Sequence, residues 1–205
     1  MLNLSRIIRY TKKEKRHLKF LKRKYYDDNK KTTWDDGSNE TKDLKSKISY
    51  LLHLNQGFKC AYCERYLIAE DKEMDHIDSK KHNKNDIYTC INIVYSCGYC
   101  NSSARKGQNS IVNLRNVNYK LNSFIILHPY LDNPEEHIIF QDEDQLYLDL
   151  PRCTEKGKET IKIFHFNDDE MNIFRASTLK TQRENPIANH QLSILIKKAV
   201  AYKRK

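Results

Sequence analysis

Two short motifs, Cys60-Ala61-Tyr62-Cys63 and Cys97-Gly98-Tyr99-Cys100, decide the fold of this 205-residue chain. Each motif separates its cysteines by two residues, so a tight turn can direct both sulfur atoms at one ion. In a reducing compartment this pattern favours metal ligation over disulfide bonding. We therefore expect a closed structural Zn²⁺ site made of Cys60, Cys63, Cys97 and Cys100. Two separate redox pairs are the alternative.

The composition excludes a membrane-spanning protein and points to a polyanionic partner. The chain has 37 Lys and Arg against 27 Asp and Glu, a net charge of +10, and a mean hydropathy of −0.83. No stretch approaches the roughly 20 apolar residues of a membrane-spanning helix, and the first residues lack the apolar run of a signal peptide. We expect a cytoplasmic protein that does not bind membranes.

The basic residues concentrate at the two ends of the chain. Residues 6–31 contain twelve Lys and Arg against three acidic residues, and the residues after Glu184 contain five and no acid. Such ends predict arms that meet nucleic acid, because lysine and arginine neutralise phosphates and release counterions. The alternative is a solvated helix face and a frayed tail.

Hydrophobic spacing and turn residues divide the chain into three expected parts. These are a basic helical arm over 1–35, a zinc-framed core over 36–110, and a mixed, then helical, extension over 111–205. The expected helices cover residues 12–26, 44–57, 101–106, 154–166, 168–182 with Asn167 as its N-cap, and a segment after Pro186. The expected strands cover 73–77, 124–127, 138–140 and 145–150, with a hairpin at 57–67, and the stretch 91–96 leads into the second cysteine motif.

Between the cysteine motifs lie Glu73-Met74-Asp75-His76-Ile77 and Asn92, and Asn101 follows the second motif directly. In these residues, over 58–107, the chain resembles the HNH, or ββα-metal, nucleases, in which two CxxC pairs frame a hairpin and a helix. The run Leu127 to Phe140, LHPYLDNPEEHIIF, and the run KGKETI at 156–161 resemble more narrowly the PtuB-type nucleases of bacterial Septu and related retron anti-phage systems.

The resemblance implies an α+β fold with a ββα-metal core and mainly helical extensions, and it implies roles for four residues. His76 would be the general base, Asp75 and Asn101 would bind a catalytic Mg²⁺ or Mn²⁺, and Asn92 would orient the loop at His76. Phosphodiester hydrolysis does need a base near neutral pKa and a hard cation with oxygen ligands. Many family members have histidine at the position of Asn101. The alternatives are a structural histidine, a turn residue at Asn92 and a helix N-cap at Asn101.

Adjacent side chains of a strand point to opposite faces, so Asp75 and His76 can serve one centre only if the strand twists or ends there. Three further residues, Lys80, Arg105 and Lys106, are candidates for phosphate contact. An exposed polar loop would have the same composition.

Taken together, these features predict a metal-dependent endonuclease, acting on DNA as the effector of an anti-phage system. The resemblance implies an ATPase partner of the SMC or ABC kind that releases the activity. An RNA-cleaving HNH nuclease is one alternative. A zinc-knuckle adaptor that binds nucleic acid or the ATPase without cutting is another.

Overall fold

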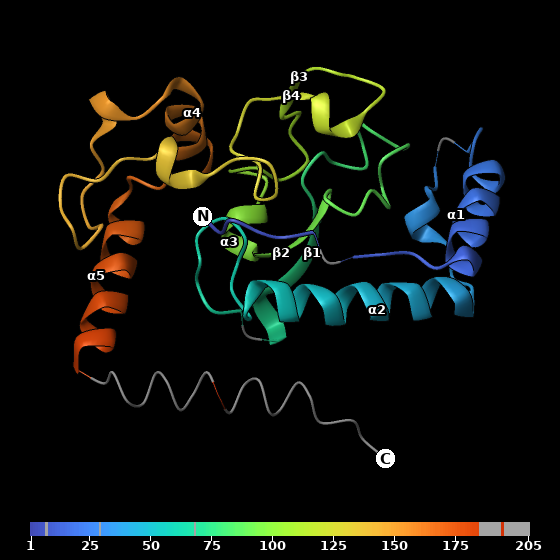
Figure 1. Ribbon diagram of the computed structural model, residues 1–205, viewed down its shortest axis with the longest axis horizontal. Coiled ribbons are helices and arrows are strands. Elements are labelled where there is room, and N and C mark those ends of the chain that lie inside the picture. The colour runs from blue at the N-terminus through green and yellow to red at the C-terminus, as the bar shows by residue number, and fades with distance from the viewer. Residues whose placement is uncertain (7, 29, 68, 185–193, 195–205) are drawn as a thin grey trace.

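The computed structural model describes residues 1–6, 8–28, 30–67, 69–184 and 194. Figure 1 shows a short hairpin and helix at the centre, with α1 at one end of the molecule and α5 at the other. The mixture of helices with two small two-stranded sheets is the expected α+β class. Within the described part, no helix combines the length and the apolar character needed to cross a membrane.

The two N-terminal helices form where the sequence supplies caps. Helix α1, Lys12–Lys24, begins at Thr11, whose hydroxyl and the Glu14 carboxylate form a capping box. A 3₁₀ turn, η1 at Thr33–Asp35, connects it to α2, Asn39–Gln56. Helix α2 ends at Gly57 in the left-handed conformation, φ 57°, as its position after the apolar stripe predicts.

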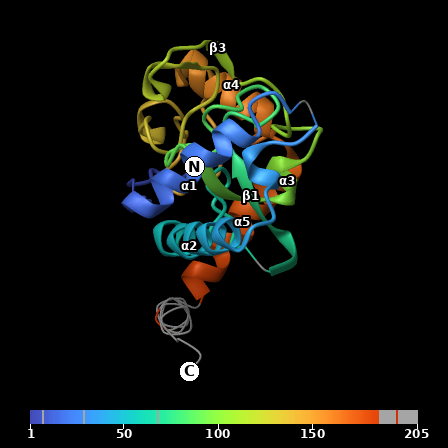
Figure 2. The ribbon, with the colours of Figure 1, turned by 90° about the vertical axis from the view of Figure 1, so that its right-hand side faces the viewer.

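The central hairpin consists of β1, Lys72–His76, and β2, Ile93–Cys97, paired antiparallel with Asp75 opposite Val94. A 3₁₀ turn, η2 at Ala69–Asp71, precedes it, and α3, Gly98–Asn101, follows. In Figures 1 and 2 the long helix α2 runs beneath this hairpin.

The expected helix over 101–106 is wrong, because α3 ends at Asn101 instead of beginning there. Ser102, the next residue, is extended with ψ 155°, and turns lead on to Gly107. Gly107 has φ 43°, and a Cβ there would lie 3.0 Å from the Ser102 carbonyl oxygen. The glycine thus permits a tight turn that folds residues 102–107 back on themselves.

The C-terminal part holds a second small sheet and two helices. Strands β3, Val112–Leu114, and β4, Ser123–Phe124, pair antiparallel around η3, Tyr119–Leu121. The 3₁₀ turns η4, Pro134–Glu136, and η5, Leu150–Arg152, precede helices α4, Glu155–Phe164, and α5, Asp169–Glu184.

Two predictions for the C-terminal part need correction, and a third concerns residues that the structure does not describe. The segments 138–140 and 145–150 meet only in a single bridge, Phe140 with Leu148, instead of forming strands. Helix α5 starts one residue later than expected, which leaves Asp168 and not Asn167 at the cap position. The helix expected after Pro186 lies outside the described residues.

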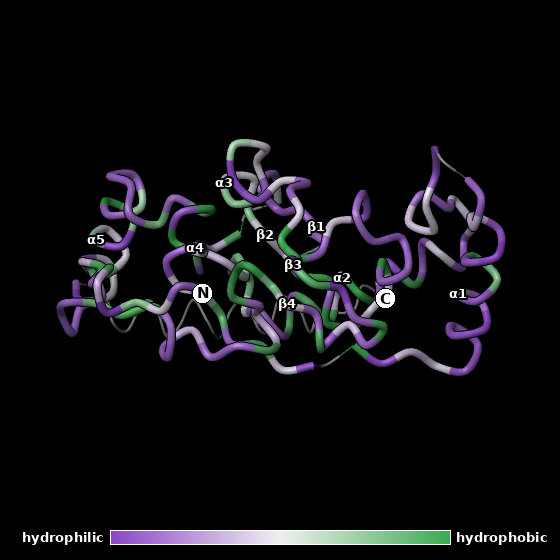
Figure 3. Tube along the Cα trace, turned by 90° about the horizontal axis from the view of Figure 1, so that it is seen from above, coloured by the Kyte–Doolittle hydropathy of each residue, from purple (hydrophilic) through white to green (hydrophobic). Residues whose placement is uncertain are grey.

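Two hydrophobic clusters lie on the two faces of the central hairpin. Val94 belongs to the cluster that contains the cysteine motifs and the C-terminal segments. Its neighbours Ile93 and Tyr95 belong to the cluster that contains α2. Every residue of β2 is buried, as expected for a strand between two cores. Figure 3 shows hydrophobic segments around the central strands, whereas α1 is largely hydrophilic.

Candidate functional site

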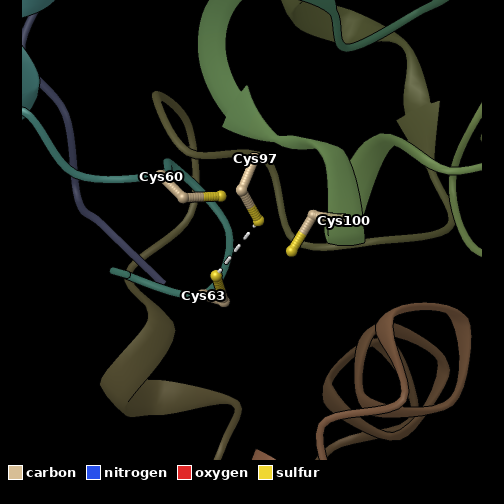
Figure 4. A group of neighbouring side chains, drawn as sticks. All are labelled: Cys60, Cys63, Cys97 and Cys100. Carbon is tan, nitrogen blue, oxygen red and sulfur yellow. Dashed lines mark hydrogen bonds between the residues drawn. The ribbon is translucent and has the colours of Figure 1, made fainter. Parts of the chain in front are cut away.

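The four cysteines of the two motifs lie together as one group. Their sulfur atoms all lie within 4.8 Å of one another, and Cys63 Sγ is 3.6 Å from Cys97 Sγ (Figure 4). A tetrahedral zinc ion with Zn–S bonds of about 2.3 Å would separate its sulfurs by about 3.8 Å. The group therefore fits a metal such as zinc, and the alternative of two separate redox pairs does not fit a single cluster of free thiols.

Local structure directs these sulfurs toward a common point. Cys60 and Cys63 flank a turn closed by the hydrogen bond from Glu64 N to Cys60 O, 3.0 Å, while Cys97 ends β2 and Cys100 lies in α3. Hydrogen bonds from Cys100 and then the other thiols lower the pKa of Cys97, whereas bonds with Cys60 and the others raise the pKa of Cys100. Four crowded thiols cannot all ionise unless a cation compensates their charge.

The side chains of β1 alternate between the two faces of the hairpin. Glu73 and Asp75 face α3 and the cysteine motifs, where they contact Asn101 and Lys106. His76 faces the other way, toward η1 and the loop that follows β1, and contacts the Trp34 ring. The structure therefore separates Asp75 from His76, although β1 ends at His76.

His76 is held by a backbone carbonyl and covered by an aromatic ring. Its Nε2 lies 3.1 Å from the carbonyl oxygen of Ile87, and the Trp34 ring packs edge-on with centroids 4.6 Å apart. The side chain is only 4% exposed. Burial, and next the charge of Lys80, lower the pKa of His76 to about 3, so the ring is neutral at pH 7.

Asp75 forms a buried ion pair instead of facing an open site. Its Oδ1 accepts from Lys106 Nζ at 2.8 Å, and its Oδ2 accepts from the Tyr62 hydroxyl at 2.6 Å. Lys106 Nζ also donates to the His76 carbonyl oxygen, 2.9 Å away, and the lysine is fully buried. In this conformation Lys106 is therefore engaged with Asp75 and shielded from solvent, where a phosphate would bind.

Asn101 and Asn92 have different surroundings. The half-buried Asn101 donates to Glu73 Oε2 at 2.6 Å from the last position of α3, so it is not the helix N-cap. Asn92 is fully buried; its oxygen accepts from Asp78 N at 2.7 Å and its nitrogen donates to the carbonyls of Asp78 and Asp86. Asn92 therefore connects Asp78 and Asp86, two positions of the loop after His76.

The other expected phosphate contacts lie on different faces. Lys80 Nζ is 5.8 Å from the Trp34 ring centre, on the His76 side of the hairpin. The Arg105 guanidinium stacks 3.4 Å from the Tyr99 ring centre and reaches the exposed Glu170 at 4.0 Å. Lys80 is thus near His76, whereas Arg105 lies near the cysteine group.

Sequence reasoning missed the residues that hold this region closed. Trp34 lies in the polar segment 27–40, whose composition predicts a turn or linker. The one signal in the sequence that distinguishes Trp34 is that the chain has a single tryptophan. Tyr119, whose hydroxyl donates to Asn92 Oδ1 at 2.7 Å, comes from the far side of the cysteine motifs and gives no local signal. The carbonyl of Ile87 is a backbone group that sequence patterns do not single out.

The described fold defines an α+β protein with a two-stranded hairpin and a short helix gathered around a four-cysteine group. No family model matches the chain, and no solved structure matches it. The chain is similar to the Septu protein PtuB of Bacillus mycoides (strain KBAB4), with 26% identity over 178 residues. That alignment covers 74% of this chain and 58% of the relative, so the chain spans less than two thirds of that protein's length.

Proposed function

We propose that the chain is a metal-dependent HNH-type endonuclease, acting on DNA in a Septu-like anti-phage system, with His76 as its general base. The hydrogen bond between His76 and Ile87 carries this proposal. A carbonyl oxygen can only accept, so Nε2 must donate, and the neutral ring then has its lone pair on Nδ1. Among the described residues no hydrogen bond engages Nδ1. In the described conformation the lowered pKa of His76, about 3, makes it a weak base. A neutral ring with a fixed tautomer and a free Nδ1 would take a proton from water once exposure to solvent brings its pKa back toward the ordinary value of about 6.5.

The described conformation is then a restrained form of the enzyme. Trp34 covers His76, and Lys45 Nζ donates a 2.5 Å hydrogen bond to the carbonyl oxygen of Trp34. Asp36, two residues on, is buried and pairs with Lys24 of α1 at 2.7 Å. Displacement of this short segment, by substrate or by an ATPase partner, would expose His76 to water.

The expected metal ligands Asp75 and Asn101 do not fit a divalent ion in this conformation. Both Asp75 oxygens already accept hydrogen bonds, one of them from the Lys106 ammonium, and Asn101 is bonded to Glu73. Metal dependence is therefore proposed from the family resemblance alone. The cysteine group supports a separate, structural zinc site.

The similarity to a Septu protein supports a role in anti-phage defence. It agrees with the resemblance of residues 127–140 and 156–161 to that group of nucleases. We propose an ATPase of the SMC or ABC kind as the partner, and DNA as the substrate in preference to RNA.

The test is cleavage of supercoiled plasmid with Mg²⁺ or Mn²⁺, with and without the ATPase subunit, and with structured RNA as a second substrate. Wild type should nick the plasmid, and His76→Ala should lose this activity while retaining zinc. Trp34→Ala should nick faster than wild type without the partner, whereas Trp34→Phe, which keeps a ring over His76, should not. Equal inactivity of wild type and His76→Ala with the partner present would refute the nuclease.

A specific observation favours a second candidate, a non-catalytic zinc-knuckle adaptor. The side chains of Asp75 and His76 lie on opposite faces of the hairpin, and Lys106 already neutralises Asp75. Such an adaptor would bind nucleic acid or the ATPase without any activity that depends on His76. The plasmid assay separates the two candidates, because only the nuclease loses an activity in His76→Ala.

A further inference from the structure

A cleft of about 290 Å³ lies between α1 and the loop after β1, and lysines surround it. Lys15, Lys19 and Lys22 line it from α1, and Lys84 lines it from the loop. No aspartate or glutamate is among its lining residues. Among the described residues, no ion pair engages Lys15, Lys19 or Lys22, whereas Lys84 Nζ donates to the Asp28 carbonyl oxygen at 2.7 Å and its charge acts on the Asp28 carboxylate. The cleft therefore has three uncompensated charges, all from α1.

The helix itself gains nothing from this arrangement. Lys15 and Lys19 are four residues apart and Lys19 and Lys22 three apart, so all three lie on one face of α1. Like charges at these spacings destabilise a helix by a few tenths of a kcal/mol per pair. A bound anion would remove this repulsion.

The dimensions of the lysine row suit a phosphate chain. The seven residue steps from Lys15 to Lys22 span about 10.5 Å at a rise of about 1.5 Å per residue. A DNA strand advances about 3.4 Å along the helix axis per phosphate, so the row extends over about three phosphates. With about 290 Å³ the cleft is at the lower end of the roughly 300–1,000 Å³ typical of pockets that bind small molecules, and four lysines line it. These features favour an extended polyanion.

The cleft adjoins the candidate base. Ile87 lines it, and the carbonyl of the same residue holds His76 Nε2. Thr33 also lines it and directly precedes Trp34, the residue that covers His76. A nucleic-acid strand bound in the cleft would therefore contact Ile87, which holds His76, and Thr33, which precedes the residue covering His76.

We infer that this lysine cleft binds the phosphate backbone of a nucleic-acid strand and places that strand beside the segment covering His76. Nucleic acid as the ligand rests on the proposed function, whereas an anionic ligand follows from the charge of the cleft. The lysines of the basic N-terminal arm that bind the strand are then Lys15, Lys19 and Lys22.

The experiment compares two triple variants of the full-length protein with the same change in charge. Lys15→Gln, Lys19→Gln and Lys22→Gln remove the cleft lysines. Lys13→Gln, Arg16→Gln and Arg23→Gln remove exposed charges of α1 that do not line the cleft. Binding of a fluorescent single-stranded oligonucleotide is measured by anisotropy over a range of salt concentrations, without added Mg²⁺ or Mn²⁺, and thermal melting verifies that both variants fold.

The cleft variant should bind at least tenfold more weakly at about 0.1 M salt. The slope of log affinity against log salt should flatten by about 2, because each lost contact with a single strand contributes about 0.7. The control variant should change affinity by less than about threefold. A third variant with arginine at the three cleft positions should bind like wild type.

Equal weakening by both glutamine variants would overturn the inference, because binding would then follow net charge alone. Unchanged oligonucleotide binding in the cleft variant, combined with lost binding to polyglutamate, would also overturn it and assign the cleft to an acidic protein. Failure of the proposed nuclease activity has a different signature. If the proposed nuclease activity is absent, His76→Ala has no effect on plasmid nicking, whereas the two triple variants still differ in oligonucleotide binding.

Discussion

Replacement of Lys106 by methionine tests whether a buried ion pair fixes the end of β1. The Lys106 and Asp75 side chains are 0% and 6% exposed, and their charged atoms lie 2.8 Å apart. Methionine keeps most of the side-chain volume but leaves the Asp75 carboxylate buried with only the Tyr62 hydroxyl as partner. Breaking a buried pair in this way costs about 3–5 kcal/mol, and we expect a loss of stability in that range.

The double variant Lys106→Met with Asp75→Asn should lose less stability than Lys106→Met alone, because it leaves no uncompensated charge. Urea unfolding of zinc-loaded protein, followed by circular dichroism and Trp34 fluorescence, measures both free energies. Lys158→Met is the matched control, since Lys158 pairs with Glu155 on the surface and should contribute less than about 1 kcal/mol. A cost below about 1 kcal/mol for Lys106→Met, or simple additivity in the double variant, would refute the reasoning.

The same variant bears on the catalytic metal. With Lys106 removed, Asp75 has one oxygen free for a cation. If Asp75 is a metal ligand, Mn²⁺ should raise the unfolding free energy of Lys106→Met more than that of the double variant, because only the folded carboxylate site would bind it.

Three further predictions concern other parts of the molecule. Cys97→Ser should reduce zinc content per chain and lower the melting temperature, measured by elemental analysis and calorimetry; full zinc retention would contradict the four-cysteine site. Burial, and next the charge of Lys156, lower the pKa of His128 to about 3, below its unfolded value of about 6.5. The contribution of neutral His128 to stability is therefore complete above pH 6.5 and falls by about 1.4 kcal/mol per pH unit as the pH drops toward 3. NMR should show no titration of His128 above pH 5, and a titration midpoint near 6.5 would contradict this prediction. Gly157→Ala should cost about 2–3 kcal/mol in urea unfolding because its Cβ would clash with the His137 carbonyl oxygen, whereas Gly37→Ala, whose Cβ meets nothing within 4 Å, should cost far less.

Local chemistry explains which parts of the fold were predictable. Helix α2 ends at Gly57 because the glycine takes the left-handed conformation, a signal that one residue supplies. The helix expected at 101–106 fails because the compact turn at Gly107 and the buried contact of Lys106 with Asp75 depend on distant groups. Helical spacing in a short polar run could not reveal either constraint.

The candidate site likewise has one feature that the sequence predicts and two that it does not. The cysteine group follows from ligand spacing, since a metal site needs only that the two turns meet. The pairing of Asp75 with Lys106 joins residues that are adjacent neither in sequence nor in any motif. The cover over His76 arises from Trp34, in a segment whose polar composition predicts only a turn.

The most direct test of the central claim is the plasmid-nicking rate of wild type and His76→Ala, measured on preparations of equal zinc content with Mn²⁺ and the ATPase partner present. Loss of a general base should lower the rate by about 10²–10⁴-fold. Metal-dependent nicking by wild type with a loss of that size in His76→Ala is the predicted result. A nicking rate unchanged by His76→Ala, or no nicking by either protein, would contradict the assignment of His76 as the base of an endonuclease.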